Sequence, residues 1–163
     1  MSTSVKIVMV EDDLGHAKLI EKNIRRANIG NEIVHFADGG TALDYLFSEE
    51  VRLNGPMLIL LDLNLPDMSG TDILEKVKAN ERLRRAPVVV LTTTDDKVEI
   101  QRCYDLGCNV YITKPVVRTT TGARFRRSSP LTRARISVPD MSGRFRSSRI
   151  SIGPLRRTSS LNR

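Results

Sequence analysis

At residues 57–70 the chain reads MLILLDLNLPDMSG. The first five residues form the most apolar run of the sequence, and their number suits a strand rather than a membrane span. A strand without polar alternation is typical of the centre of a parallel sheet, where helices cover both faces. The run ends at Asp62, and a loop with Pro66 and Gly70 follows it. We therefore expect a buried central strand whose carboxyl end carries an acidic side chain.

Strand and helix patterns alternate on both sides of this run. Four more short apolar segments are expected to form strands: residues 5–10, 32–36, 87–91 and 109–112. Between the strands, apolar residues recur at three- and four-residue steps, as in the helix expected over residues 14–27. Asp13 and Asp95 are expected N-caps, and Gly30 is the expected stop of the first helix. Five strands that alternate with helices predict an α/β fold with a parallel sheet and right-handed crossovers.

The composition changes sharply after residue 115. Residues 1–115 carry 14 Lys and Arg against 18 Asp and Glu, a net charge of −4, whereas residues 116–163 carry 12 Arg and one acid, a net charge of +11. The tail also holds nine Ser and five Thr, and it lacks a sustained helical or strand period. A segment of this kind buries too little apolar surface to offset the entropy of ordering it. We expect a disordered tail over residues 118–163.

Targeting signals and cysteine motifs are not found in the sequence. No apolar run approaches the roughly 18 residues of a membrane helix, and the start MSTSVKIVMVEDD has neither a basic region nor a small-residue cleavage site. Cys103 and Cys108 lie five residues apart, which matches no common zinc or redox motif. We expect a cytoplasmic protein with two reduced thiols and no membrane contact.

Polar residues end the expected strands and should meet at one edge of the sheet. Glu11 and Asp12 follow the first strand, Asp62 the third, Thr92 the fourth and Lys114 the fifth. Ligands of open parallel sheets bind at this edge. Converging carboxylates repel one another, and Mg²⁺ compensates them because it takes oxygen ligands. A lysine and a hydroxyl group suit a phosphoryl group, and an aspartate can itself be the nucleophile that forms an acyl phosphate. The pattern predicts a phosphoryl site with Mg²⁺.

Four motifs carry a resemblance to a known family: VMVEDD, LLDLNLPDMSG, VVVLTTT and YITKP. In this order and at this spacing they resemble the response-regulator receiver domain of two-component signalling, over residues 5 to about 117. The resemblance implies a receiver domain over residues 1–117 with a flavodoxin-like (CheY-like) doubly wound sheet of five parallel strands, in the order 2-1-3-4-5. The segments DDLGHAKLIEKNIRRANI and FADGGTALDYLF look closer to single-domain regulators that work with phytochrome-type histidine kinases.

The resemblance also implies a role for each acid at the sheet edge. Asp62 would be the phosphoacceptor, which takes a phosphoryl group from a kinase phosphohistidine. Mg²⁺ would be bound by Asp12, Asp62 and the backbone carbonyl of Asn64, and Glu11 would act partly through water.

The remaining implied roles concern the phosphoryl group and the switch. Thr92 would hydrogen-bond the phosphoryl oxygen, Lys114 would pair with the acyl phosphate, and a cis peptide at Pro115 would orient Lys114. Tyr111 stands at the position of the switch aromatic, whose ring turns inward when Thr92 moves. The alternative for Tyr111 is a half-buried tyrosine of a strand.

The chain departs from the family after residue 117. A receiver domain continues there with a fifth amphipathic helix that often builds a dimer surface, whereas this sequence continues with the Arg-rich tail. A reading-frame shift after Val116 or Val117 would explain the tail; alternatively, the tail is an arm that binds nucleic acid or an acidic partner. We favour the frameshift because the break falls inside an element that the fold needs. The fifth helix, and with it the usual homodimer, is expected to be missing.

These observations favour a phospho-accepting switch over two other functions. Its partners would be a sensor histidine kinase and a downstream protein that the sequence does not identify, and it would be an enzyme only toward its own phosphorylation and dephosphorylation. A regulator that binds nucleic acid through the tail is the alternative, and a steep weakening of binding with salt would identify it. A Mg²⁺-dependent phosphohydrolase is disfavoured, because Asn64 stands where a second aspartate would be needed.

Overall fold

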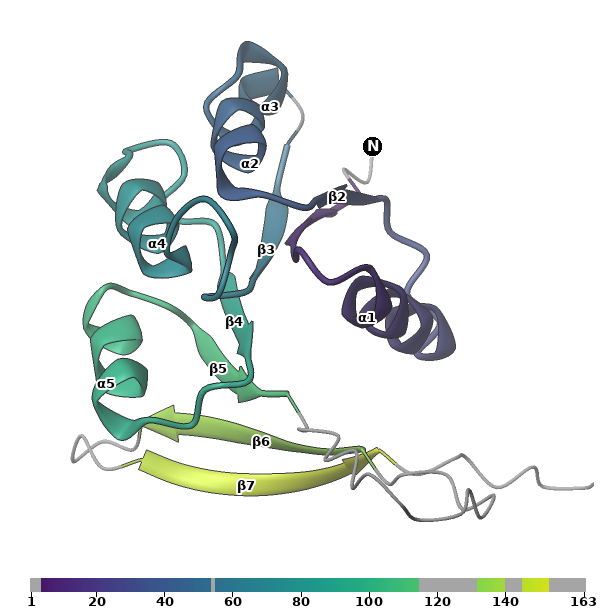
Figure 1. Ribbon diagram of the computed structural model, residues 1–163. Coiled ribbons are helices and arrows are strands. Elements are labelled where there is room, and N and C mark those ends of the chain that lie inside the picture. The colour runs from purple at the N-terminus through teal and green to yellow at the C-terminus, as the bar shows by residue number, and fades with distance from the viewer. Residues whose placement is uncertain (1–3, 54, 115–131, 140–144, 153–163) are drawn as a thin grey trace, which may run out of the picture.

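The computed structural model of the chain describes residues 4–53, 55–114, 132–139 and 145–152 (Figure 1). Five strands form the parallel part of the sheet, and they pair in the order β2-β1-β3-β4-β5. Their bounds are β1 Lys6–Val10, β2 Ile33–Phe36, β3 Met57–Leu61, β4 Val88–Thr92 and β5 Val110–Thr113. The expected parallel sheet and its strand order are thus confirmed, with the apolar run at residues 57–61 in the centre.

Helices lie on both sides of the sheet. In Figure 1, α1 lies on one side, and α2, α4 and α5 lie on the other. The helices are α1 Leu14–Arg26, α2 Gly39–Leu46, α3 Glu49–Leu53, α4 Gly70–Ala79 and α5 Lys97–Asp105. The short helix α3, which is separated from the end of α2 by two residues, was not predicted from the sequence.

Two of the residues expected to begin or end a helix do not do so, although the helix expected over residues 14–27 is found over Leu14–Arg26. Asp96, rather than Asp95, caps α5, and its carboxylate accepts hydrogen bonds from the backbone N–H groups of Val98 and Glu99. Helix α1 ends before Gly30, because Asn28 takes a left-handed conformation with φ of 59°. Asn tolerates that conformation better than most residues do, so no glycine is needed at this turn.

Two apolar cores of unequal size lie on the two sheet faces, because successive strand residues point to opposite faces. The larger core lies between the sheet and α2, α4 and α5, and includes Val8, Val10, Ile59, Leu61, Ile73, Leu74, Val77, Val88, Val90 and Tyr111. The smaller core lies under α1 and consists of Ile7, Met9, Ala17 and Leu60, with half-buried neighbours such as Leu58, Val89 and Leu91. The strand ends that carry the polar residues are thus held from both sides.

Two segments of the expected disordered tail, residues 132–139 and 145–152, are strands in the structure. They form strands β6 Thr132–Pro139 and β7 Phe145–Ile152, which pair antiparallel and extend the sheet beyond β5 to seven strands. Pairing with β6 gives hydrogen-bond partners to backbone groups of β5, which would be unpaired if β5 were the edge strand. A signal was present in the sequence, since small and apolar residues alternate with Arg and Ser from Arg133 to Val138. The rest of the tail, including residues 118–131 where the fifth helix would stand, lies outside the described residues.

Candidate functional site

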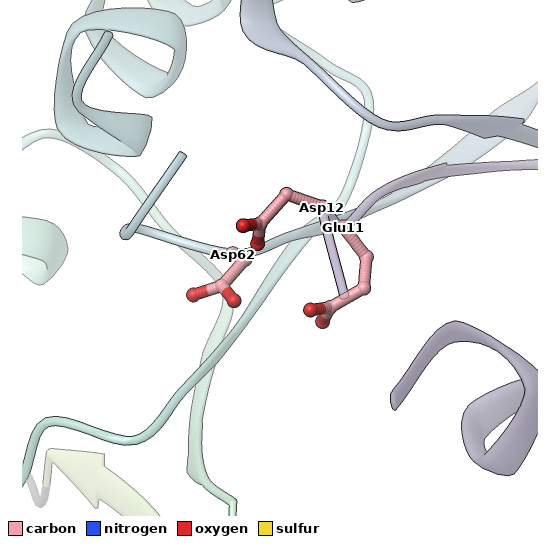
Figure 2. Close-up of side chains that lie close together, drawn as sticks. All are labelled: Glu11, Asp12 and Asp62. Atoms are coloured by element: carbon pink, nitrogen blue, oxygen red, sulfur yellow. The ribbon is translucent and has the colours of Figure 1, made fainter. Parts of the chain in front are cut away.

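Three carboxylates meet at the carboxyl ends of β1 and β3. Glu11 and Asp12 directly follow β1 and Asp62 directly follows β3, and Figure 2 shows the three side chains together. One carboxylate oxygen from each residue lies within 4.8 Å of the other two. The two strands are neighbours, and the Asp62 N–H donates to the Val10 carbonyl at 3.0 Å. Glu11 and Asp62 are only 1% and 6% exposed, whereas Asp12 is exposed.

Lys114 supplies the positive charge for the two buried carboxylates. Its backbone N–H donates to the Thr92 carbonyl at 2.7 Å, which fixes the residue at the end of β5. Its ammonium Nζ donates to Asp62 Oδ2 at 2.6 Å and also to Glu11 Oε2. Burial raises the pKa of the Glu11 carboxyl, as does the charge of Asp62, while the Lys114 ammonium acts in the opposite direction. The sequence analysis placed these residues at one edge, and the structure brings them into direct contact.

Asn64 and Thr92 lie beside the acidic cluster and contact each other. The Asn64 side-chain amide Nδ2 donates to Thr92 Oγ1 at 3.1 Å, and the Asn64 backbone N–H donates to Asp62 Oδ1 at 3.2 Å. Thr92 is fully buried at the end of β4. Its hydroxyl therefore faces the loop that follows Asp62.

Tyr111 is turned inward. Its side chain is fully buried in the larger core, and its hydroxyl donates to the Thr94 carbonyl at 3.0 Å. Burial raises the pKa of Tyr111 well above its usual value. Tyr111 is thus fully buried in β5 rather than half-buried, and its role as the switch aromatic stays a prediction. Pro115 lies outside the described residues, and its cis peptide bond stays a prediction.

The loop between β3 and α4 is compact and leaves little room at its end. The Gly70 N–H donates to the Leu63 carbonyl at 2.9 Å, and Asn64 forms an isolated bridge with Ser69. A Cβ atom on Gly70 would lie 2.2 Å from the Asp62 carbonyl oxygen. Gly70 therefore allows α4 to begin directly against the backbone of Asp62.

Sequence reasoning missed three contacts around the site. Asp67 accepts hydrogen bonds from the backbone N–H groups of Gly39 and Gly40. His16 Nδ1 lies 3.6 Å from Glu11 Oε1, and His35 Nε2 lies 2.7 Å from the Glu11 carbonyl oxygen. The sequence signal for the contact of His16 was the expected N-cap Asp13, because a cap at this position puts His16 in the first turn of α1.

The site opens to solvent through a cavity of about 540 Å³. It is lined by Asp12, Glu99 and residues 63–69. The three carboxylates offer oxygen donors only, which is the kind of ligand that Mg²⁺ prefers, and the open cavity leaves room for the waters that this ion keeps. The residues present therefore fit a hard divalent cation. Among the described helices, none has the length and apolar character to span a membrane.

Known receiver domains match most of this chain. The family model of the response regulator receiver domain matches residues 7–125. A crystal structure of a response regulator receiver domain from Rhodospirillum rubrum is 66% identical with a TM-score of 0.66, and the match covers 69% of this chain and 82% of that one. The crystal structure of the phosphorylated cyanobacterial phytochrome response regulator RcpA is 38% identical with a TM-score of 0.63, over 70% of this chain and 83% of that one.

A third relative is the response regulator Rcp1 from Synechocystis sp., which is 37% identical over 110 residues, 66% of this chain and 75% of Rcp1. The crystal structure of its Mn²⁺-bound form has a TM-score of 0.62, with 36% identity over 68% of this chain and 81% of that one. The five-stranded parallel sheet, the acidic cluster joined to Lys114 and these matches lead to one conclusion: the chain belongs to the response regulator receiver domains of two-component systems.

Proposed function

We propose that this chain is a phospho-accepting switch in which Asp62 takes a phosphoryl group from the phosphohistidine of a sensor histidine kinase. The observation that carries the proposal is the placement of Asp62. Its carboxylate is nearly buried, yet it lies among residues that line an open cavity, with the Lys114 ammonium at 2.6 Å and two further carboxylates within 4.8 Å. Such a group is shielded from bulk water but within reach of a phosphoryl group that enters through the cavity.

Mg²⁺ is the proposed cofactor. Asp12, Asp62 and the backbone carbonyl of Asn64 would hold it, and Glu11 would act partly through water. When bound, the ion supplies positive charge that stabilises the oxygens of the transferred phosphoryl group. The oxygen-only donor set supports this choice, and Rcp1, whose structure was solved in a Mn²⁺-bound form, is a relative that takes a divalent cation.

The proposed transfer step uses the carboxylate of Asp62 as the nucleophile. An oxygen of Asp62 bonds to phosphorus while the bond between phosphorus and the kinase imidazole nitrogen breaks. The imidazole leaves with the electron pair of that bond, and it leaves as a neutral ring when its other nitrogen carries a proton. The product is an acyl phosphate on Asp62, whose added negative charge Lys114 would pair with.

The switch would then run through Thr92 and Tyr111. The Thr92 hydroxyl oxygen accepts from the Asn64 amide, so its own O–H can still donate to a phosphoryl oxygen on Asp62. The Tyr111 ring already lies inward, bonded to the Thr94 carbonyl two residues after Thr92. A movement of Thr92 would therefore act on the backbone that the tyrosine holds, and on the surface of the β4–α5 loop that a downstream protein could contact.

The kinase partner that we propose is of the phytochrome type. The similarity to RcpA, a phytochrome response regulator, supports this choice. We also propose a cytoplasmic location without membrane contact, and catalysis limited to the chain's own phosphorylation and dephosphorylation. Nucleic acid is not needed for this function, and the usual homodimer through a fifth helix is not expected.

Phosphorylation by a small donor tests the proposal. Incubated with Mg²⁺ and acetyl phosphate, the chain should gain one acid-stable, base-labile phosphoryl group, and EDTA should prevent the gain. Asp62→Asn should abolish it because the amide is not a nucleophile here. Asp44→Asn, which removes an exposed carboxylate from α2, is the matched control and should label like the unaltered chain. Undiminished labelling of Asp62→Asn, measured by intact mass, would show that the assignment is wrong.

A further inference from the structure

In the loop that follows Asp62, one carboxylate accepts two hydrogen bonds from the start of a helix that is far away in the sequence. Asp67 lies in the β3–α4 loop, and its Oδ1 accepts from the Gly39 N–H at 2.8 Å while its Oδ2 accepts from the Gly40 N–H at 2.7 Å. These donors are the first two N–H groups of α2, which have no partner within the helix itself. One side chain therefore takes both, across 27 and 28 residues of sequence.

The start of α2 is arranged so that this contact is possible. Asp38 caps the helix and accepts from the next free donor, the Thr41 N–H at 2.8 Å, and it leaves the first two N–H groups to Asp67. A Cβ atom on Gly39 would lie 2.5 Å from Met68 Cγ, so a glycine at this position lets the loop approach the helix. The negative charge of Asp67 also suits the positive end of the helix dipole.

The same loop carries groups of the candidate metal site. Asn64 lies three residues before Asp67, and residues 63–69 line the cavity together with Asp12. At its other end the loop is closed by the Gly70 N–H bond to the Leu63 carbonyl. The loop is thus fixed at its base by that bond and at its tip by Asp67, while Asn64 itself is held by its bridge to Ser69 and its bonds to Asp62 and Thr92. The contact at the tip adds to these direct contacts in fixing the direction of the Asn64 carbonyl.

We infer that Asp67 is a positioning residue for the metal ion: its contact with Gly39 and Gly40 holds the β3–α4 loop so that the Asn64 carbonyl points at the metal position. This inference rests on the proposed function for the identity of the ion. Because coupling between two sites is reciprocal, Mg²⁺ binding should also make the first turn of α2 more rigid.

The test is a Mg²⁺ titration of the full chain, followed by the backbone amide NMR signals of Asn64, Gly39 and Gly40, without any phosphodonor. Loss of a residue that orients a metal ligand weakens metal binding about 10-fold or more. We expect about that weakening for Asp67→Ala and a smaller one for Asp67→Asn, which keeps one acceptor oxygen. Asp44→Ala, which removes an exposed charge from the same helix, should bind Mg²⁺ like the unaltered chain.

Hydrogen exchange and kinetics separate positioning from a merely structural role. Mg²⁺ should slow amide exchange at Gly39 and Gly40 in the unaltered chain and not in Asp67→Ala. Phosphorylation of the variant should need more Mg²⁺ for half its maximal rate, with the maximal rate retained at saturating Mg²⁺. A variant that melts earlier but binds Mg²⁺ as tightly as the unaltered chain would overturn the inference.

The two proposals fail in different ways. If the unaltered chain is phosphorylated with Mg²⁺ and Asp67→Ala behaves identically, the positioning role is wrong and the phosphoacceptor stands. If the unaltered chain binds Mg²⁺ but gains no phosphoryl group, the proposed function is wrong, and the NMR titration still decides the role of Asp67. Should Asp67→Ala fail to fold, Asp67→Asn provides the same comparison.

Discussion

Lys114 is the counter-charge of two buried carboxylates, so its removal changes the charge balance of the site. The ammonium contacts both Glu11 and Asp62, and all three side chains are at most 7% exposed. A buried pair that loses one partner leaves an uncompensated charge, at a cost of about 3 kcal/mol or more. A divalent cation that binds the freed carboxylates would restore part of that stability, because it binds the folded state.

We therefore expect Lys114→Met to lower the free energy of unfolding by about 3 kcal/mol in EDTA, and by less in Mg²⁺. The penalty should also shrink as the pH falls toward the raised pKa of Glu11, because a neutral carboxyl needs no counter-charge. Denaturant titrations in both buffers measure the effect. Lys18→Met, which removes an exposed lysine of α1, is the control and should change neither value. Equal stability of Lys114→Met and the unaltered chain in EDTA would contradict this account.

At the scale of elements, Gly70 determines how closely α4 approaches the phosphoacceptor. A Cβ atom added to Gly70 would lie 2.2 Å from the Asp62 carbonyl oxygen. Because that oxygen belongs to the backbone, no side-chain rotation can relieve the clash. We expect Gly70→Ala to cost about 1–3 kcal/mol of stability and to slow phosphorylation, because the shift falls on Asp62 itself. Gly30→Ala is the control, since nothing lies within 4 Å of that position. If the two variants have the same denaturant midpoint and the same labelling rate, then α4 does not lie as close to the Asp62 backbone as described.

The elements that the sequence predicted best are those with an unambiguous local pattern. The run at residues 57–61 is apolar throughout and became the central strand, and the expected N-cap Asp13 caps α1. The strands β6 and β7 were missed because the Arg and Ser content suggested disorder, whereas the two-residue alternation in β6 fitted a strand. Composition averages over a segment, but strand formation depends on the order of residues and on an available edge, here β5.

The candidate site likewise contains contacts that the sequence predicts and contacts that it does not. Glu11, Asp12, Asp62 and Lys114 could be predicted to meet because parallel strands end at one edge of the sheet. The contact of Asp67 with α2 could not be predicted, because it joins a loop to the start of a helix, and their approach depends on packing rather than on strand direction.

At the scale of the whole molecule, the two sheet faces are covered unequally. Among the described residues, the face toward α2, α4 and α5 holds the larger core, whereas the face under α1 holds four buried residues and several half-buried ones. Adjacent residues of β4 belong to different faces: Val90 is fully buried in the larger core, and Val89 is half-buried beside the smaller one.

This difference should be measurable within one strand. Val90→Ala should lower the free energy of unfolding by about 2 kcal/mol, from lost burial and the cavity left behind. Val89→Ala removes the same two methyl groups from a site that water already reaches, and it should cost less than half as much. Urea titrations of the two variants give the comparison. Equal costs would mean that the α1 face is packed as densely as the other.

The contact between Lys114 and Glu11 joins residues 103 positions apart in the chain. During synthesis, therefore, the charge cluster cannot assemble until nearly all of the parallel sheet has left the ribosome. Pairings of such high contact order also tend to form slowly. A chain that has acquired its full affinity for a phosphodonor has thus completed its sheet, so that the ability to receive a signal marks the end of folding.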